Sequence, residues 1–253
     1  MGYNPGRDLR LTEGLTEPGY GGPRPTGVIL AGGLGTRMRG VLPDTAKPLA
    51  AVQGRPFLTF LLSQLERAGI GRIILCTGHR GDQVRAAIGE SFDGVPIEYS
   101  VEDQPLGTGG ALRLAVQRYG DGQTWMVMNG DSLVDINLCH LYSEHQRAGL
   151  AATIAAVAVP DGRRYGTLEC SADGRIVAFR EKSEDPRPVW INAGVYLLEP
   201  LFLEALPSAV PLSLEREVFP EWICRGLHVS QHHARFIDIG TPESYALAQE
   251  FFR

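Results

Sequence analysis

Residues 27–38, GVILAGGLGTRM, are the stretch from which the rest of this chain is best interpreted. Val28, Ile29 and Leu30 form a short apolar run that predicts a buried strand. Three glycines follow it: Gly32, Gly33 and Gly35. Glycine lets a turn come close to a ligand, and successive N–H groups in such a turn can bind an anion. Thr36 adds a hydroxyl and Arg37 a planar guanidinium suited to phosphate, so the stretch predicts a phosphate-binding loop.

The sequence of this loop does not match the motifs of two better-known phosphate-binding loops. A dinucleotide-binding fingerprint, G-x-G-x-x-G, would need a third glycine where Met38 stands. A P-loop ends in Gly-Lys-Ser/Thr, whereas Gly35 is followed by Thr36 and Arg37. A plain tight turn between two elements is the remaining alternative, because glycine-rich turns are common.

The composition is that of an ordinary globular protein. The chain has 253 residues, of which 43% are hydrophobic and 21% charged. Its net charge of -5 gives no basic footprint for nucleic acid, and no apolar run approaches the roughly 20 residues that span a bilayer. The four cysteines are far apart and form no Cys-x-x-Cys pair, which indicates free thiols in a reducing compartment.

The first 25 residues differ from the rest of the chain. They hold six glycines and four prolines, show no periodicity and lack the apolar core of a signal peptide. We expect residues 1–25 to be a flexible tail, residues 26–253 to be a single domain, and the protein to be cytoplasmic.

Apolar runs and helical periodicity alternate after the glycine loop. Strands are predicted at residues 28–30, 72–77, 97–101 and 124–128, and helices at 56–68, 82–88 and 109–119. This alternation predicts an α/β fold with a Rossmann-like, doubly wound, mostly parallel sheet. Ligands of such sheets lie beyond the carboxyl ends of the strands, where residues 32–37, 102–110 and 129–131 would meet.

The second half of the chain is richer in strands. Strands are predicted at residues 151–159, 167–170, 176–180, 189–197 and 236–239, and helices at 138–148, 201–206, 214–224 and 242–252. Residues 172–174, Ala-Asp-Gly, predict a hairpin turn. We expect this half to extend the same sheet and to add a β-rich part that covers the substrate.

His232 and His233 are predicted to lie on an edge strand rather than in a metal site, because no other ligand stands at zinc spacing.

Seven short segments together resemble the sugar-1-phosphate nucleotidyltransferases, which join a sugar 1-phosphate to a nucleoside triphosphate and release pyrophosphate. They stand in the family's order from residue 27 to the C-terminus. The segments are LAGGLGTRM (30–38), KPL (47–49), PLGTGGA (105–111), NGD (129–131), FREK (179–182), NAG (192–194) and DIGTP (238–242).

The resemblance implies roles for individual residues. The residues that would bind the nucleotide are Leu30, Ala31, Gly32, Gly33, Gly35, Thr36, Arg37, Glu102, Gly107 and Thr108. Those that would bind the sugar phosphate are Gly130, Glu181, Lys182, Asn192 and Gly194. The catalytic residues would be Arg37, Lys47, Asp131 and Lys182. Asp131 and Asp238 would hold Mg²⁺, a hard ion that prefers carboxylate and phosphate oxygens.

Three further segments favour one group within the family. RYGT (164–167), SLER (213–216) and FIDIGTP (236–242) resemble the D-glycero-α-D-manno-heptose 1-phosphate guanylyltransferases. Mannose 1-phosphate guanylyltransferases share residues 105–108, and thymidylyl- and uridylyltransferases share the glycine loop. Glu102 favours GTP, because a carboxylate only accepts hydrogen bonds and guanine offers two adjacent donors. A non-catalytic nucleotide-sugar-binding subunit is the alternative of another class, and a homo-oligomer is compatible with either.

Overall fold

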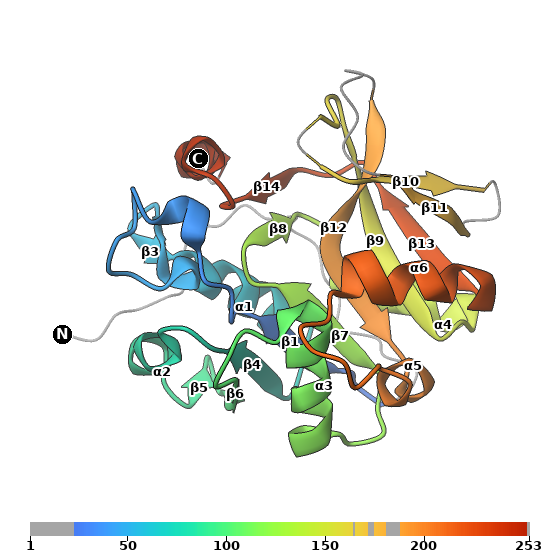
Figure 1. Ribbon diagram of the computed structural model, residues 1–253, viewed down its shortest axis with the longest axis horizontal. Helices are drawn as coiled ribbons and strands as arrows, with labels where there is room; N and C mark the ends of the chain where they lie inside the picture. The colour runs from blue at the N-terminus through green and yellow to red at the C-terminus, as the bar shows by residue number, and fades with distance from the viewer. Residues whose placement is uncertain (1–22, 164, 172–174, 181–187, 252–253) are drawn as a thin grey trace.

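The computed structural model describes residues 23–163, 165–171, 175–180 and 188–251 (Figure 1). The predicted site residues Glu181 and Lys182, the predicted hairpin turn at 172–174 and most of the predicted tail therefore lie outside the described residues.

The centre of the fold is a parallel sheet. Its strands are β1 (Thr26–Leu30), β4 (Ile73–Thr77), β6 (Val95–Val101) and β7 (Trp125–Asn129). They pair in the order β7-β1-β4-β6, and β1 and β4 are almost entirely buried. Strands covered on both faces are expected to contain continuous apolar runs, as Val28, Ile29 and Leu30 of β1 do. The short strand β5 (Ser91–Phe92) closes one edge in the antiparallel sense.

The rest of the sheet is mainly antiparallel and extends from β7. Strand β12 (Val189–Leu198) pairs with β7, and both β9 (Ala152–Val159) and β10 (Thr167–Cys170) pair with β12. The outer strands are β11 (Ile176–Arg180), beside β10, and β13 (Leu227–His232), parallel to β9. These ten strands form one mixed sheet, which confirms the predicted α/β fold class.

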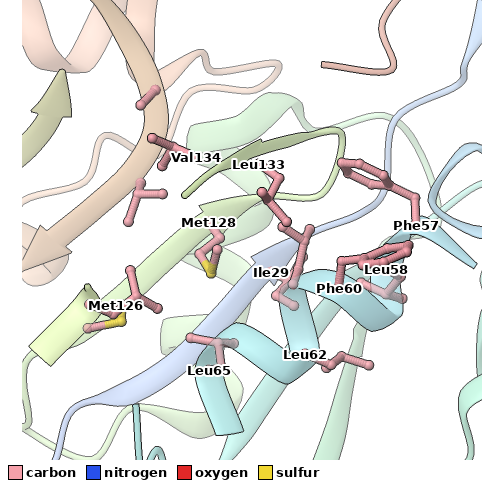
Figure 2. Packing of buried hydrophobic residues seen from close by; sticks show 14 of the residues in the cluster. Ile29, Phe57, Leu58, Phe60, Leu62, Leu65, Met126, Met128, Leu133 and Val134 are labelled. Carbon is pink, nitrogen blue, oxygen red and sulfur yellow. The ribbon is translucent and has the colours of Figure 1, made fainter. Parts of the chain in front are cut away.

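Helices cover both faces of this sheet, as a doubly wound fold requires. One face carries α1 (Phe57–Arg67), α2 (Gly81–Ile88) and α4 (Leu138–Ala148), while α7 (Pro242–Phe251) packs against strand β14 (Phe236–Asp238). The other carries α3 (Gly107–Tyr119), α5 (Pro200–Glu204) and α6 (Phe219–Trp222). Alternate residues of one strand serve the two cores: Ile29 packs with α1, and Val28 packs with α3. Figure 2 shows Ile29, Met126 and Met128 of the sheet against Phe60 and Leu65 of α1.

Short elements line the edge of the sheet where the strands end. They are the 3₁₀ helices η1 (Thr36–Met38) and η2 (Lys47–Leu49), the strand pair β2 (Ala51–Val52) and β3 (Arg55–Pro56), and the strand pair β8 (Ser132–Val134) and β14 (Phe236–Asp238). The ribbon of β8 and β14 stands beside the main sheet (Figure 1). It brings a segment near the C-terminus to the end of β7.

The structure corrects one predicted helix and adds five strands that were not predicted: β2, β3, β5, β8 and β13. Residues 214–224 form a π-helical turn, η3 (Leu214–Val218), then α6 and the 3₁₀ turn η4 (Ile223–Arg225), instead of one regular helix. Pro220 stands at the junction and has no N–H to continue a regular ladder. Of the residues in β13, only the last, His232, was predicted to lie on a strand, because the run contains only two strongly apolar residues.

The first described residues are already packed against the domain. The Tyr142 hydroxyl donates a hydrogen bond to the carbonyl of Pro23 at 3.0 Å, and Pro25 is buried. Deleting residues 2–22 is therefore expected to leave the melting temperature nearly unchanged, since that segment is predicted to be a flexible, Gly- and Pro-rich tail. Deleting residues 2–25 is expected to lower it. A drop of several degrees with the shorter deletion would show that the tail packs on the domain.

Buried His145 ties α4 to the end of β12 through Glu199. Its Nε2 lies 2.8 Å from Glu199 Oε1, and its Nδ1 lies 2.8 Å from Thr153 Oγ1. The hydrogen bond with His145 lowers the pKa of Glu199 below its ordinary value of 4.5, against the opposing effect of burial. A lowered pKa means that this contribution to stability is complete above about pH 4.5 and is lost as the pH falls through the lowered value.

Glu199→Gln is expected to lower the free energy of unfolding near pH 7 by about 1 kcal/mol, because it removes a charged acceptor of partly buried hydrogen bonds. The difference from wild type should shrink as the pH falls below about 4.5. Urea denaturation at a series of pH values measures this, with Glu204→Gln, an exposed position on α5, as the control. A difference that stays constant with pH would contradict the assignment.

Candidate active site

Two adjoining cavities open where the central strands end. The first has a volume of about 430 Å³ and the second about 820 Å³. Four residues line both: Arg37, Asn129, Asp131 and Gly240. A reaction between two molecules, one in each cavity, would therefore take place beside these four residues.

The glycine loop forms the wall of the first cavity. It leaves β1 at Leu30 and ends in η1, so Arg37 stands at the border between the cavities. Every predicted nucleotide-binding residue lines this cavity: Leu30, Ala31, Gly32, Gly33, Gly35, Thr36, Arg37, Glu102, Gly107 and Thr108. Gly130 of the predicted sugar-phosphate set lines it as well.

Lys47 and Asp131 form an ion pair at the border of the cavities. The Lys47 ammonium is 2.6 Å from Asp131 Oδ2, and the two residues are 84 positions apart in the chain. The Lys47 side chain is 13% exposed and that of Asp131 is 46% exposed, so the carboxylate faces the open space and the ammonium lies beneath it. This pair places one positive and one negative charge where a phosphate or a metal ion could contact them.

Asp238 comes from the neighbouring strand of the β8–β14 ribbon. It stands opposite Ser132, the residue that follows Asp131, and it lines the second cavity. Its Oδ1 accepts hydrogen bonds from Gly240 N (2.8 Å) and Ser244 Oγ (2.9 Å), and its Oδ2 accepts one from the Tyr165 hydroxyl (2.8 Å). These donors fix its orientation.

The two aspartates suit Mg²⁺ by their chemistry. Mg²⁺ usually takes one or two carboxylates and completes its shell with water and substrate phosphate oxygens. Among the described residues no group of three His, Cys, Asp or Glu side chains could hold a metal by itself. One carboxylate just before β8 and one on its partner strand β14, next to a loop suited to phosphate, therefore fit an ion that is shared with a substrate.

Glu102 is held firmly in the wall of the first cavity. Its Oε2 accepts a hydrogen bond from Leu106 N at 3.1 Å, and its Oε1 lies against the backbone of Gly32 and Gly78. A Cβ at either glycine would lie 2.4 Å or 2.6 Å from Oε1, so a larger residue at either position would displace the Glu102 side chain. Burial raises the pKa of Glu102, and the Leu106 N–H acts in the opposite direction.

The N-terminus of α3 is already capped by the chain itself. Gly109 N and Gly110 N donate to the carbonyl of Leu212 at 2.8 and 3.4 Å, and Leu212 N donates to Leu106 O at 2.8 Å. Gly107 has a φ of +76°, and a Cβ there would lie 2.4 Å from Leu212 O. This helix end therefore contributes to the cavity wall through Gly107 and Thr108, and its capped N–H groups are not directed at a phosphate.

The second cavity is lined by residues from the antiparallel half of the sheet. Asn192 and Gly194 of β12 line it, as expected of sugar-phosphate residues. Sequence reasoning assigned no role to several other lining residues, among them Asn129, Arg163, Tyr165, Glu215 and Arg216. Most of these residues lie within the segments that resemble the nucleotidyltransferases, and that resemblance was the signal that could have identified them. Arg163 instead precedes one, and it pairs with Asp161.

The histidines and cysteines noted in the sequence line neither cavity. His232 lies on edge strand β13, 2.8 Å from Ser230 Oγ, as an edge-strand residue would, while His233 lies just beyond the strand. The four cysteines are free thiols. Within the described ranges, no helix has the length and apolar character needed to cross a membrane.

Two known guanylyltransferases are similar to this chain over most of its length. The chain is 37% identical over 222 residues to a mannose-1-phosphate guanylyltransferase of Mycobacterium tuberculosis, covering 86% of this chain and 62% of that protein. It is 33% identical over 224 residues to a D-glycero-alpha-D-manno-heptose 1-phosphate guanylyltransferase of Aneurinibacillus thermoaerophilus, covering 88% and 96%. It thus spans less than two thirds of the first relative and nearly all of the second.

The fold is also similar to a solved structure with a bound nucleotide analogue. The crystal structure of HddC from Yersinia pseudotuberculosis complexed with GMP-PN matches with a TM-score of 0.78 and 33% identity, over 90% of this chain and 99% of that one. Residues 26–253 match the Nucleotidyl transferase family. Since that match runs from the first strand through the last helix, the chain belongs to the nucleotidyl transferase family.

Proposed function

We propose that this protein is a sugar-1-phosphate guanylyltransferase that joins GTP to a sugar 1-phosphate and releases pyrophosphate. The observation that carries the proposal is the pair of cavities that share Arg37, Asn129, Asp131 and Gly240. The first, with the glycine loop, suits a nucleoside triphosphate, and the second suits a sugar phosphate. Relatives that act on a heptose phosphate and on mannose 1-phosphate both support guanylyl transfer. Of the two sugars we favour D-glycero-α-D-manno-heptose 1-phosphate.

The reaction needs charge neutralisation more than proton transfer. An oxygen of the sugar phosphate attacks the α-phosphorus of GTP, forming one P–O bond and breaking the bond to pyrophosphate. The nucleophile is already ionised, so positioning and electrostatic stabilisation account for catalysis, and no covalent enzyme intermediate is expected.

Each charged group has a place in this scheme. The glycine loop and Arg37 hold the triphosphate and the leaving pyrophosphate, and the Lys47 ammonium offsets phosphate charge at the border of the cavities. Asp131 and Asp238 would hold Mg²⁺, which supplies Lewis-acid polarisation of the phosphate oxygens when bound. Lys182 is assigned to the sugar phosphate and Glu181 to the sugar, by resemblance alone.

A matrix of four nucleoside triphosphates against several sugar 1-phosphates tests the proposal. The sugars should include mannose 1-phosphate, glucose 1-phosphate and the heptose 1-phosphate, with pyrophosphate release as the readout. GTP with a manno-configured sugar is expected to be fastest. Fastest turnover with dTTP or UTP and glucose 1-phosphate would favour the thymidylyl- or uridylyltransferase alternative. Absence of turnover with every pair would favour a non-catalytic nucleotide-sugar-binding subunit.

Glu102 is proposed to select the base. Its carboxylate can accept from both N1–H and the N2 amine of guanine, whereas uracil and thymine offer one donor flanked by acceptors. Glu102→Gln is expected to reduce the preference for GTP over UTP and dTTP by about tenfold to a hundredfold, because an unpaired buried polar group costs about 1–3 kcal/mol. Competition assays on kcat/KM measure this ratio.

The control for that experiment is Glu98→Gln, on strand β6, which ends one residue before Glu102; Glu98 lines neither cavity. If Glu102→Gln leaves the nucleotide ratio unchanged, Glu102 does not select the base and serves only to pack the loop ends at Gly32 and Gly78.

A further inference from the structure

A hydrogen-bond network joins the two cavities, and the carboxylate of Glu215 is its centre. Glu215 belongs to η3 and lines the second cavity. Its Oε2 accepts hydrogen bonds from Thr108 Oγ1 at 2.8 Å and from Ser213 Oγ at 3.0 Å. Thr108 lines the first cavity, and its hydroxyl also accepts a hydrogen bond from Leu214 N at 2.9 Å. One side of the carboxylate therefore fixes the first turn of α3 in the nucleotide cavity.

The other side of the same carboxylate reaches the second cavity. Glu215 Oε1 accepts a hydrogen bond from the hydroxyl of Tyr196, a fully buried residue of β12. The Tyr196 oxygen in turn accepts from Asn192 Nδ2 at 2.9 Å and from Asn129 Nδ2 at 3.4 Å. Asn192 cannot turn freely, because its Oδ1 accepts from Gly194 N at 2.8 Å. The proposed sugar-phosphate residues of β12 are thus tied to Glu215.

One atom of the network is left without a partner. Asn129 Oδ1 is buried and has no hydrogen-bond partner among the described residues, although Asn129 lines both cavities. A buried acceptor without a donor costs free energy. A hydroxyl donor that arrives with a substrate could relieve this cost by a small shift of Asn129, and that shift would pass to Tyr196 and Glu215.

We propose that Glu215 is a positioning residue that couples the two cavities, so that filling one raises the affinity of the other. The inference rests on the proposed function, because it takes the first cavity for GTP and the second for the sugar phosphate. The charge on Glu215 matters here: hydrogen bonds to an ionised acceptor are stronger than neutral ones, so all three hydroxyls orient toward it. Couplings between two sites are commonly fivefold to about a hundredfold in affinity.

Calorimetry with a non-reacting pair measures the coupling directly. The probes are GTP with a methylene bridge between its α- and β-phosphates, and mannose 1-phosphate, both with Mg²⁺. Each Kd is measured alone and with the other probe saturating, for wild type, Glu215→Gln and Glu217→Gln. Glu217 is the matched control: it belongs to the same turn and accepts from Ser213 N at 2.7 Å, but it is exposed and lines neither cavity.

We expect each probe to raise the affinity of the other at least about fivefold in wild type and in Glu217→Gln. In Glu215→Gln this factor should fall toward one, while the affinity of each probe alone changes less than the coupling does. If the role of Glu215 were purely structural, Glu215→Gln would instead weaken the affinity for each probe alone and leave the coupling factor between them unchanged. Should Glu215→Gln fail to fold, Tyr196→Phe removes a single hydroxyl and breaks the same link on the sugar side.

The proposal is wrong if wild type shows no coupling, or if Glu215→Gln or Tyr196→Phe keeps the full factor. Failure of the proposed function would be seen elsewhere: in the substrate matrix, wild type would then release pyrophosphate from no pair, or fastest from dTTP or UTP with glucose 1-phosphate. The two failures are therefore distinguishable.

Discussion

Asp131→Asn is expected to lower kcat by at least about a hundredfold, as loss of one electrostatic stabiliser at a reacting centre commonly does. The substitution removes the negative charge that faces both cavities and leaves the Lys47 ammonium, 2.6 Å away, without its anionic partner. The fold should remain intact, because the Asp131 side chain is 46% exposed. Asp238→Asn is expected to have an effect of similar size. Steady-state pyrophosphate release at limiting and saturating Mg²⁺ measures both.

Asp93→Asn provides the control for loss of one carboxylate. Asp93 is exposed in the β5–β6 turn, away from both cavities, and its φ of +46° is one that asparagine also adopts. The metal assignment would be refuted if both active-site variants kept near-normal rates at limiting Mg²⁺. Calorimetric titration of Mn²⁺ with the GTP analogue present adds a readout that is independent of turnover.

Arg37→Ala is expected to weaken GTP binding by about tenfold to a hundredfold, since a guanidinium–phosphate hydrogen bond is charge-assisted and often bidentate. Arg37 lines both cavities, so the variant also reports which substrate it serves. A rise in the Kd of the GTP analogue, with little change for mannose 1-phosphate, would place it on the nucleotide.

Arg39→Ala is the matched control, because Arg39 is exposed two residues further along and lines neither cavity. Unchanged affinity for the analogue in Arg37→Ala would exclude the phosphate-loop assignment. A selective loss of sugar-phosphate affinity would instead move Arg37 to the second cavity.

Most strands and helices were predictable because their signals are local. The β1 run is apolar and β-branched, and α1 repeats its apolar residues at helical spacing, so each pattern needs no distant partner to be recognised. The predictions failed where a local sequence pattern was weak or was interrupted. Pro220 interrupts an otherwise helical apolar pattern, and β13 alternates polar and apolar residues over only six positions.

Most of the chemical groups of the site could also be predicted from the sequence. A strand followed by Gly32, Gly33, Gly35 and Arg37 predicts a phosphate loop, and aspartates placed after apolar runs predict carboxylates at strand ends. The structure brings these groups to one edge of the sheet, as expected of parallel strands whose carboxyl ends meet there.

What the sequence alone determined is therefore the order of elements and the type of chemistry, because both depend on residue type and near-neighbour spacing. Only the tertiary structure decided that two cavities share one border, that Leu212 caps α3, and that Glu215 stands between Thr108 and Tyr196. Lys47 and Asp131 are 84 residues apart, and Thr108 and Glu215 are 107 apart. Contacts at such separations are set by how the packed sheet and helices bring distant segments together, and no local pattern records them.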